Sequence, residues 1–347
     1  MATTRELAGL RTRWATPHGS ALATEVFRRL ARNRDIAPIV ERHDGRLDLR
    51  GIRLPDPTTT TSEERTLLRR MFRLDRRSAV HQLRKATVAN IDFSYAELPR
   101  IMFMACEIRD CRFERADVED GGLWECRVTD TSFEGANLRS VVLGGRGYPP
   151  AHPPTPYDRV SFASADLRDA VPGAADFTDC DFSGARIDKL EFEGCTFVRC
   201  RFAGRLSDVI WAAADDRDPR RRGSLVDVDM SATVLTFCAF RGLDLSDVKL
   251  PAAPEHIVFE NFACAIKRAL AALHGTDDPN ERGLRGLLQA HADWTLPRQG
   301  RGILGVADLH PDGTLTKGEP IAAWLKQLDR ECAASVAGGE MAASHGE

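Results

Sequence analysis

Large apolar residues recur at every fifth position through three blocks of the chain. Of the 28 positions in this pattern, only Pro172 is not a large apolar side chain. Positions five apart lie about 140° apart around a helix and on opposite faces of a strand. One apolar face with this period therefore requires a turn within every five residues. The pattern predicts a solenoid of stacked coils, in which each coil contacts its neighbours.

The blocks run from Leu83 to Leu143, from Phe162 to Phe202 and from Leu225 to Leu250. A small residue, mostly alanine or cysteine, stands two positions before the large one and is expected to point inward as well. Free cysteine fills such a position as a compact apolar group, so we expect structural thiols there. Cys264 and Cys332 lie outside the pattern and show no partner spacing. The predicted core contains Phe93, Phe103, Phe113, Phe133, Phe177, Phe182, Phe192, Phe197, Phe202, Cys106, Cys126, Cys180 and Cys200.

Units such as ADLRD, ANLRS, ADFTD and CDFSG resemble the A-[DN]-[LF]-x-x signature of the pentapeptide-repeat proteins. The resemblance covers roughly residues 83–250. It implies a mainly β fold, a right-handed quadrilateral β-helix with four units and twenty residues in each coil and about seven coils in all. Phe93, Phe113 and Phe133 are then expected to stack in one ladder.

The chain divides into three predicted regions. Residues 1–82 form a basic, largely helical N-terminal cap with a partial first coil around Leu47–Leu54, and residues 83–250 form the β-helix. Residues 251–347 form a helical C-terminal cap and a candidate dimerisation region. Within this cap, residues 256–275 read as an amphipathic helix that seals the end of the solenoid, because exposed terminal coils need cover against edge pairing.

Two interruptions of the repeat, residues 144–159 and 205–224, are predicted to project as loops. The first contains five prolines, and the second contains an arginine cluster. Binding residues concentrate on loops that a rigid scaffold holds, although surface loops also accept insertions that contact nothing. The candidate contact residues in these loops are Tyr148, Tyr157, Trp211, Arg220 and Arg221.

Charge is distributed unevenly along the chain. The net charge is −3, but residues 1–85 carry 19 basic and 10 acidic side chains, whereas residues 86–250 carry 20 basic and 28 acidic ones. A capping box, Thr61 to Glu64, opens a predicted helix over residues 62–77 with arginines along one face. These arginines could meet phosphates or an acidic partner, or they could form the solvated face of a capping helix.

No motif of an enzyme or of a cofactor site is present, so we predict a protein without catalysis or cofactor. One segment, residues 308–319, partly follows a calcium-binding loop at Asp308, Asp312 and Glu319, but His310 replaces an oxygen ligand there. The alternative is an Asp-Gly turn that leads into a helix. No apolar segment suits a membrane span or a secretory signal, so the cytoplasm is the expected compartment.

The best-characterised pentapeptide-repeat proteins protect DNA gyrase or topoisomerase IV from inhibitors, with a β-helix that resembles B-form DNA in width and negative charge. The resemblance implies the same role here, in antibiotic resistance or self-immunity. The acidic residues expected to face the partner are Glu97, Glu114, Asp117, Glu119, Asp120 and Glu134. The alternative is a structural scaffold that presents loops to another protein partner and has no topoisomerase role. A homodimer is considered, and direct nucleic-acid binding is not expected.

Overall fold

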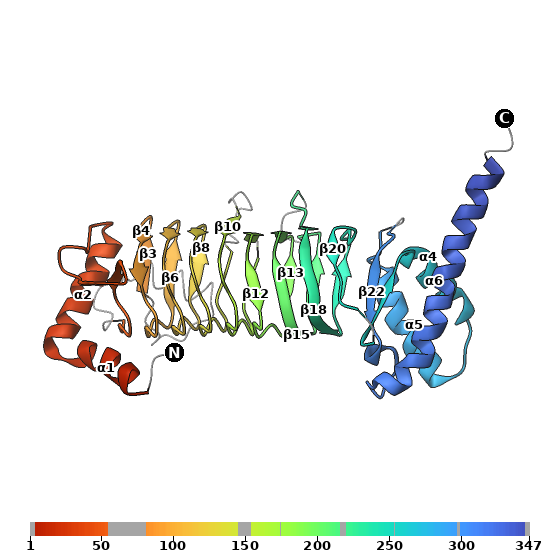
Figure 1. The fold of residues 1–347 in the computed structure, drawn as a ribbon, viewed down its shortest axis with the longest axis horizontal. Coiled ribbons are helices and arrows are strands. Elements are labelled where there is room, and N and C mark those ends of the chain that lie inside the picture. Colours follow the sequence, from red (N-terminus) through yellow and green to blue (C-terminus); the bar gives the residue numbers. More distant parts are fainter. Residues whose placement is uncertain are drawn as a thin grey trace. The chain divides into compact units, whose positions relative to one another are not determined.

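The computed structural model describes residues 4–54, 81–144, 154–173, 175–215, 220–252, 254–296 and 299–343. The chain forms two compact units, Met1–Arg186 and Ile187–Glu347. Each unit consists mainly of parallel β-strands and carries its helices at one end (Figure 1). Among the described residues, no helix is both long and apolar enough to cross a bilayer. The predicted helix 62–77, its capping box and Tyr148 lie outside the described residues.

The first unit opens with two helices, α1 (Thr4–Ala15) and α2 (Pro17–Ala31). Thr16 caps α2, because its hydroxyl accepts a hydrogen bond from the amide of Gly19 at 3.0 Å. Pro17 then fills the first helical turn, where a proline leaves no helical donor unsatisfied. The buried face of α2 consists of Gly19, Ala23, Val26, Phe27 and Leu30.

A short hairpin joins these helices to the coils. Its strands β1 (Arg42–His43) and β2 (Arg46–Asp48) pair antiparallel, and β2 pairs in parallel with β5 (Ile91–Asp92). Leu47 lies opposite Ile91 in this register. Residues 46–54 therefore add part of a coil in front of residues 91–97.

The other strands of the first unit stack in parallel. In one sheet, Val88 pairs with Ile108, and Ile108 pairs with Val128. Each partner lies twenty residues further along the chain. The chain therefore returns to the same sheet after each coil of twenty residues. These strands are β3 (His81–Arg84), β4 (Thr87–Ala89), β6 (Ile101–Met104), β7 (Glu107–Arg109), β8 (Gly122–Trp124), β9 (Arg127–Thr129), β10 (Thr155–Asp158), β11 (Ala175–Thr178) and β12 (Asp181–Ser183).

Phe93, Phe113, Phe133, Phe162 and Phe182 form one ladder of stacked rings in this unit. Successive ring centroids lie 4.8, 4.9, 5.6 and 5.0 Å apart, within the range of favourable aromatic pairs. The predicted stacking of the first three rings is confirmed. The ladder continues across the first interruption, because the ring of Phe162 stacks on that of Phe133.

Tyr157 belongs to the core, so the prediction that it lies in a contact loop is wrong. It lies in β10 opposite Val128 and Phe177, and its ring stacks on that of Phe177 at 5.0 Å. Its side chain is buried, and its hydroxyl donates to the carbonyl of Leu143. A buried tyrosine needs such a partner. The predicted loop therefore does not extend through residues 155–158, which form β10.

The corners of the coils hold residues in the left-handed region of backbone conformation. Aspartate adopts this conformation more readily than most residues because its short side chain can hydrogen-bond locally. The amide of Asp110 donates to the carbonyl of Thr129 in the next coil, and that of Asp130 to the carbonyl of Asp158. The corner aspartates of the first unit are Asp110, Asp120, Asp130, Asp169 and Asp179, with φ between 47° and 59°.

The second unit continues with parallel strands and then changes to helices. Its strands are β13 (Glu191–Glu193), β14 (Thr196–Val198), β15 (Arg201–Ser207), β16 (Ile210–Ala212), β17 (Ser224–Val226), β18 (Val228–Thr236), β19 (Ala239–Arg241), β20 (Val248–Lys249), β21 (His256–Phe259) and β22 (Gly302–Gly305). Its helices are α4 (Phe262–Ala272), α5 (Pro279–Ala292), the 3-10 turn η1 (Ala307–Leu309) and α6 (Leu315–Ala343).

Trp211 is also a core residue, so the prediction that it is a contact residue of a loop is wrong. It lies in β16 opposite Phe192 and Phe240, and its ring stacks on both, at centroid distances of 5.9 and 4.8 Å. Only 1% of its surface is exposed. The five-residue period does not predict that Trp211 points inward, because the buried residue after Phe202 is Leu206, only four positions later.

The C-terminal region begins with a strand, whereas a helix was predicted over residues 256–275. β21 pairs antiparallel with β22, and α4 starts only at Phe262. Ile257, Val258 and Phe259 have the high β-propensity of such a strand, and the strand that pairs with them lies about 45 residues further along the chain. Behind the hairpin, Ile266, Leu288 and Leu325 form part of one buried cluster.

Cys264 and Cys332, which show no partner spacing in the sequence, form a disulfide. Their Cα atoms lie 6.1 Å apart, and the bond joins α4 to α6 across 68 residues. The spacing of the two cysteines carries no sign of this pair, because the contact depends on how two helices pack. The seven cysteines of the repeat positions are free thiols. Burial raises the pKa of the Cys111 thiol to about 12, so this thiol stays neutral.

Three side chains of the C-terminal region bind the backbone of the last coils. Nε2 of His256 accepts from the amide of Leu235 at 2.9 Å, and the carboxylate of Asp308 accepts from that of Phe237 at 2.8 Å. The guanidinium of Arg301 donates to the carbonyl of Val248 at 2.9 Å. These contacts satisfy backbone groups that a further coil would otherwise pair.

Candidate functional site

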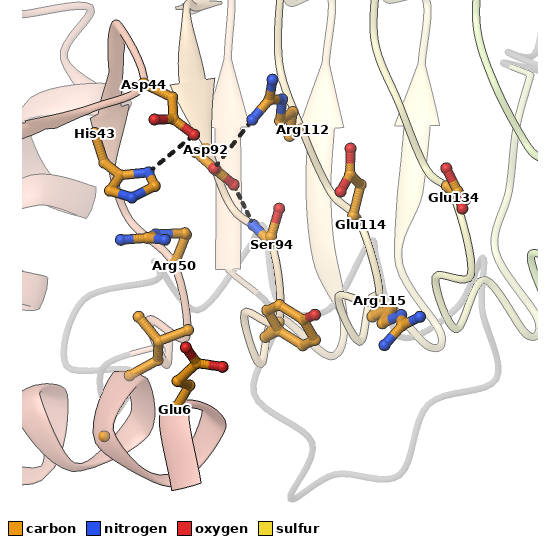
Figure 2. A pocket seen from close by; sticks show the side chains of 13 residues that line it. Glu6, His43, Asp44, Arg50, Asp92, Ser94, Arg112, Glu114, Arg115 and Glu134 are labelled. Carbon is orange, nitrogen blue, oxygen red and sulfur yellow. Dashed lines mark hydrogen bonds and ion pairs between the residues drawn. The ribbon is translucent and has the colours of Figure 1, made fainter. Parts of the chain in front are cut away.

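A polar cavity of about 860 Å³ lies in the first unit, between α1, the hairpin and the first complete coils. Figure 2 shows charged side chains from both sides around it. Their signs are mixed, since arginines alternate with carboxylates. The acidic and basic residues that line the cavity are Glu6, His43, Asp44, Arg50, Asp92, Arg112, Glu114, Arg115 and Glu134.

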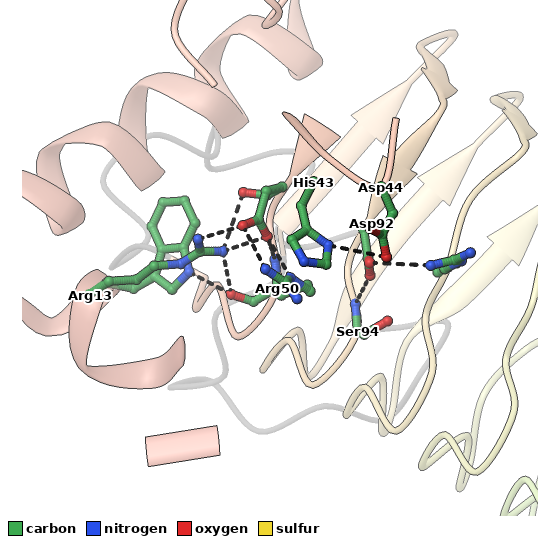
Figure 3. Close-up of polar contacts among 9 residues, drawn as sticks. Arg13, His43, Asp44, Arg50, Asp92 and Ser94 are labelled. Carbon is green, nitrogen blue, oxygen red and sulfur yellow. Dashed lines mark hydrogen bonds and ion pairs between the residues drawn. The ribbon is translucent and has the colours of Figure 1, made fainter. Parts of the chain in front are cut away.

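Asp48 lies behind one wall of the cavity and holds the lining residue Arg50 in place. Its carboxylate accepts from Arg13 at 2.8 Å through each of two guanidinium nitrogens, and from Nε of Arg50 at 2.9 Å (Figure 3). The indole of Trp14 donates to the carbonyl of Arg50 at 2.8 Å. Burial alone would raise the pKa of the Asp48 carboxyl, but the hydrogen bonds from Arg13 and Arg50 hold it well below its usual range. This network fixes α1 against the partial coil.

Asp92 forms the floor of the cavity. Its carboxylate is almost fully buried, accepts from the amide of Ser94 at 2.9 Å and lies 3.9 Å from the guanidinium of Arg112. Most buried carboxylates are paired in this way, because an isolated buried charge is costly. Asp92 therefore holds the corner before Ser94 and orients Arg112 toward the cavity.

Glu114 and Glu134 occupy the open side of the cavity, at equivalent positions of consecutive coils. Between them in sequence, Arg115 places its guanidinium 6.0 Å from the ring centre of Tyr95, within reach of a cation–π contact. This side can accept donors from a partner's peptide or side chains, whereas the wall on Asp48 is already satisfied internally.

Of the other four acidic candidates, three form ion pairs and Asp117 accepts a hydrogen bond from a side-chain amide. Glu97 lies 2.7 Å from Arg53 and 3.2 Å from Arg11. Asp117 accepts from the amide of Asn137 at 2.9 Å. The remaining pairs are Asp120 with Arg100 at 3.7 Å and Glu119 with Arg139 at 4.0 Å. The coil surface is therefore a mosaic of both charges.

The structure thus brings Glu114 and Glu134 together at the cavity. It places Glu97 and Asp117 at neighbouring positions of adjacent coils, where Asn137 binds both Asp117 and Glu119. Arg221 donates to the carbonyl of Gly194 at 2.6 Å and is partly buried, while Arg220 is exposed. Sequence reasoning missed Arg13, Asp48 and Asp92. A signal exists for Asp48, because it stands between Leu47 and Leu49 where the repeat places an outward polar residue.

The three carboxylates of residues 308–319 do not converge. Asp308 binds the amide of Phe237, and burial raises the pKa of its carboxyl. Asp312 lies 3.6 Å from Nδ1 of His310, and Glu319 lies within α6. Over the part of the chain that the structure describes, no group of three or more His, Cys, Asp or Glu side chains could hold a metal ion.

The family model of pentapeptide repeats (8 copies) matches residues 158–194 and 175–204. No curated protein sequence is significantly similar to the chain. Among solved structures, a trypsin-treated form of QnrB1, a plasmid-mediated fluoroquinolone resistance protein, is 17% identical with a TM-score of 0.27, and the match covers 60% of this chain and 85% of that one.

Two cyanobacterial structures are similar as well. HetL, a pentapeptide repeat protein involved in heterocyst differentiation regulation in Nostoc sp. strain PCC 7120, is 17% identical with a TM-score of 0.23, over 56% of this chain and 92% of that one. Rfr23 from Cyanothece 51142 is 14% identical with a TM-score of 0.18, over 47% and 87%. At these identities and scores, no function transfers to this chain.

Proposed function

We propose that this pentapeptide-repeat protein is a non-catalytic binding protein whose coils, wound as a right-handed quadrilateral β-helix, present carboxylates to a cationic surface of a protein partner. DNA gyrase or topoisomerase IV is the partner that this chemistry fits best. The binding would protect the enzyme from its inhibitors, because an acidic surface competes for a saddle that otherwise holds DNA phosphates.

The corner aspartates of the first unit carry the proposal. Asp110, Asp120, Asp130 and Asp169 expose between 42% and 67% of their side chains. Asp110 and Asp130 occupy the same corner of consecutive coils, which lie about 4.8 Å apart. Asp120 and Asp169 occupy a second corner, with Ser140 between them. A DNA strand presents one phosphate about every 3.4 Å of helix axis. The net charge of residues 86–250 has the same sign.

A second candidate is a scaffold for a partner other than a topoisomerase, and the arginines of the coils favour it. Arg159 lies 2.6 Å from the carboxylate of Asp130, and Arg139 lies 3.8 Å from that of Asp169. Such pairs interrupt the negative rows. A surface of mixed charge selects one complementary partner rather than any DNA-binding saddle.

A supercoiling assay with purified gyrase, with and without a quinolone, tests the proposal. We expect the protein to inhibit supercoiling or to restore it in the presence of the drug, in proportion to its concentration. The triple variant D110N/D120N/D130N should lose this effect. The control D247N/D277N/D312N removes the same charge from exposed positions of the second unit and should keep the effect.

If saturating protein changes neither supercoiling nor drug-induced cleavage by gyrase or topoisomerase IV, the topoisomerase role is wrong. The second candidate then requires that the protein capture a defined partner from a cell extract. That capture should weaken in D110N/D120N/D130N and persist in the control variant. Equal capture by both variants would remove the corner aspartates from either function.

A further inference from the structure

Five cations surround β4, the first strand of its parallel sheet. Oδ1 of Asn33, just after α2, accepts from the amide of Thr87 at 2.9 Å. This bond fixes Arg32 and Arg34 beside the start of the strand. Lys85 stands two residues before the strand, at a corner with φ of 51°, and follows Arg84 directly.

The fifth cation, Arg42, lies at the other end of β4. Asn90 follows the strand, and its side-chain amide donates to the carbonyl of Gly45 at 3.4 Å. The same carbonyl accepts from the guanidinium of Arg42 at 2.7 Å. A strand of three residues is about 10 Å long, so the cations flank one short edge from both ends.

These five side chains, the β4 cation cluster, differ from the other arginines nearby. All five residues are exposed, and none forms an ion pair with any residue that the structure describes. In contrast, Arg13 and Arg50 share Asp48, and Arg28 and Arg29 share Glu25. Among the described residues, no carboxylate therefore pairs with the cluster.

Two ordinary roles explain part of the cluster. Charged residues at an edge strand discourage pairing with another chain, and cations are favourable near the C-terminus of a helix such as α2. Neither role requires five cations, and neither prefers arginine to lysine. Four of the five are arginines, whose planar guanidinium can bind a phosphate through two parallel hydrogen bonds.

We propose that the β4 cation cluster binds the phosphate backbone of nucleic acid. The contacts would be independent of base sequence, because the side chains lie around a strand edge and phosphate contacts carry no sequence information. The site adjoins the corner of Asp110, which lies one coil beyond Asn90, so DNA bound here would lie next to the first of the corner aspartates.

Fluorescence anisotropy with a labelled 20-base-pair duplex tests this proposal on the full chain. We expect binding at 50 mM salt that weakens as salt rises, with a log–log slope between about −2 and −4, since each phosphate contact contributes about −0.9. R32E/R34E should weaken binding about tenfold or more and reduce the slope by about 2. R282E/R285E makes the same charge change at two exposed positions of α5 and should bind like wild type.

The variant R42E/K85E acts at residues outside the α2 terminus and tests the cluster even if R32E/R34E fails to fold. Circular dichroism establishes which variants keep the native structure. Absence of binding at 50 mM salt overturns the proposal, and so does equal loss in the control variant. Binding to vesicles that contain phosphatidylserine, without binding to the duplex, would assign the cluster to membranes and also overturn it.

Discussion

The imidazole of His256 accepts a hydrogen bond from the backbone amide of Leu235, with 2.9 Å between the two nitrogens. His256 comes from the C-terminal region, and Leu235 belongs to β18. The bond satisfies the backbone N–H of Leu235, which a further coil would otherwise pair. It requires the neutral imidazole, because only an unprotonated Nε2 can accept.

Two histidines, His256 and His291, make the free energy of unfolding depend on pH. Burial lowers the pKa of His256 below 6.5, and burial lowers that of His291 to about 4. The unfolded chain therefore takes up protons first as pH falls below 6.5, and the folded state loses stability. For His291 alone the loss between pH 7.5 and 5.0 is about 2 kcal/mol. Urea unfolding at the two pH values measures it.

The variant H256Q supplies an amide oxygen as acceptor and should reduce the loss of stability at low pH. H274Q changes an exposed histidine of the same unit, and its pH dependence should match wild type. If H256Q and wild type lose the same free energy between pH 7.5 and 5.0, the hydrogen bond to Leu235 does not control this dependence.

The phenylalanine ladder should dominate the stability of the first unit. Phe113 stacks between Phe93 and Phe133 at 4.8 and 4.9 Å. Replacing it with alanine leaves a cavity that rigid coils cannot close, so F113A should cost about 3–5 kcal/mol in urea unfolding. F237A removes a ring that is 54% exposed and should cost less than about 0.5 kcal/mol. Similar costs for both variants would contradict the ladder.

Asp48 should stabilise the packing of α1 against the hairpin at neutral pH. Its pKa is lowered in the folded state, so its contribution is present above pH 3.8 and is lost as pH falls through the folded pKa. D48N should cost about 1–3 kcal/mol at pH 7, and the difference from wild type should shrink toward pH 3. D44N, at an exposed carboxylate of the same cavity, serves as the control. A D48N cost that does not change with pH would mean that the charge of Asp48 contributes nothing.

The bond between Cys264 and Cys332 predicts the number of reactive thiols. Protein purified without reductant and denatured should show seven free thiols, and nine after reduction. The bond closes a loop of 68 residues, so its loss should destabilise the second unit by about 4 kcal/mol in the chain-entropy model. The matched variant C264S/C332S should behave like the reduced protein. Nine reactive thiols before reduction would show that the bond does not form.

Some residues of the candidate site could be predicted from the sequence, and others could not. Glu114 and Glu134 could be chosen because the repeat fixes which positions point outward and which coils are neighbours. Arg13 and Asp92 could not, because the first reaches the coils from a helix and the second is polar at a position that the fold buries. Arg13 contacts Asp48, which is 35 residues away, and Asp92 pairs with Arg112 of the adjacent coil.

The five-residue period by itself determined the stacked coils and the ladder of Phe93, Phe113 and Phe133, because each unit repeats one local conformation and one pair of inward side chains. Only the tertiary structure decided that Tyr157 and Trp211 join that core, that β21 pairs with β22, and that two distant cysteines meet. A period records interactions that recur at a fixed separation along the chain. A contact made once, between segments brought together by folding, has no period and leaves no such record.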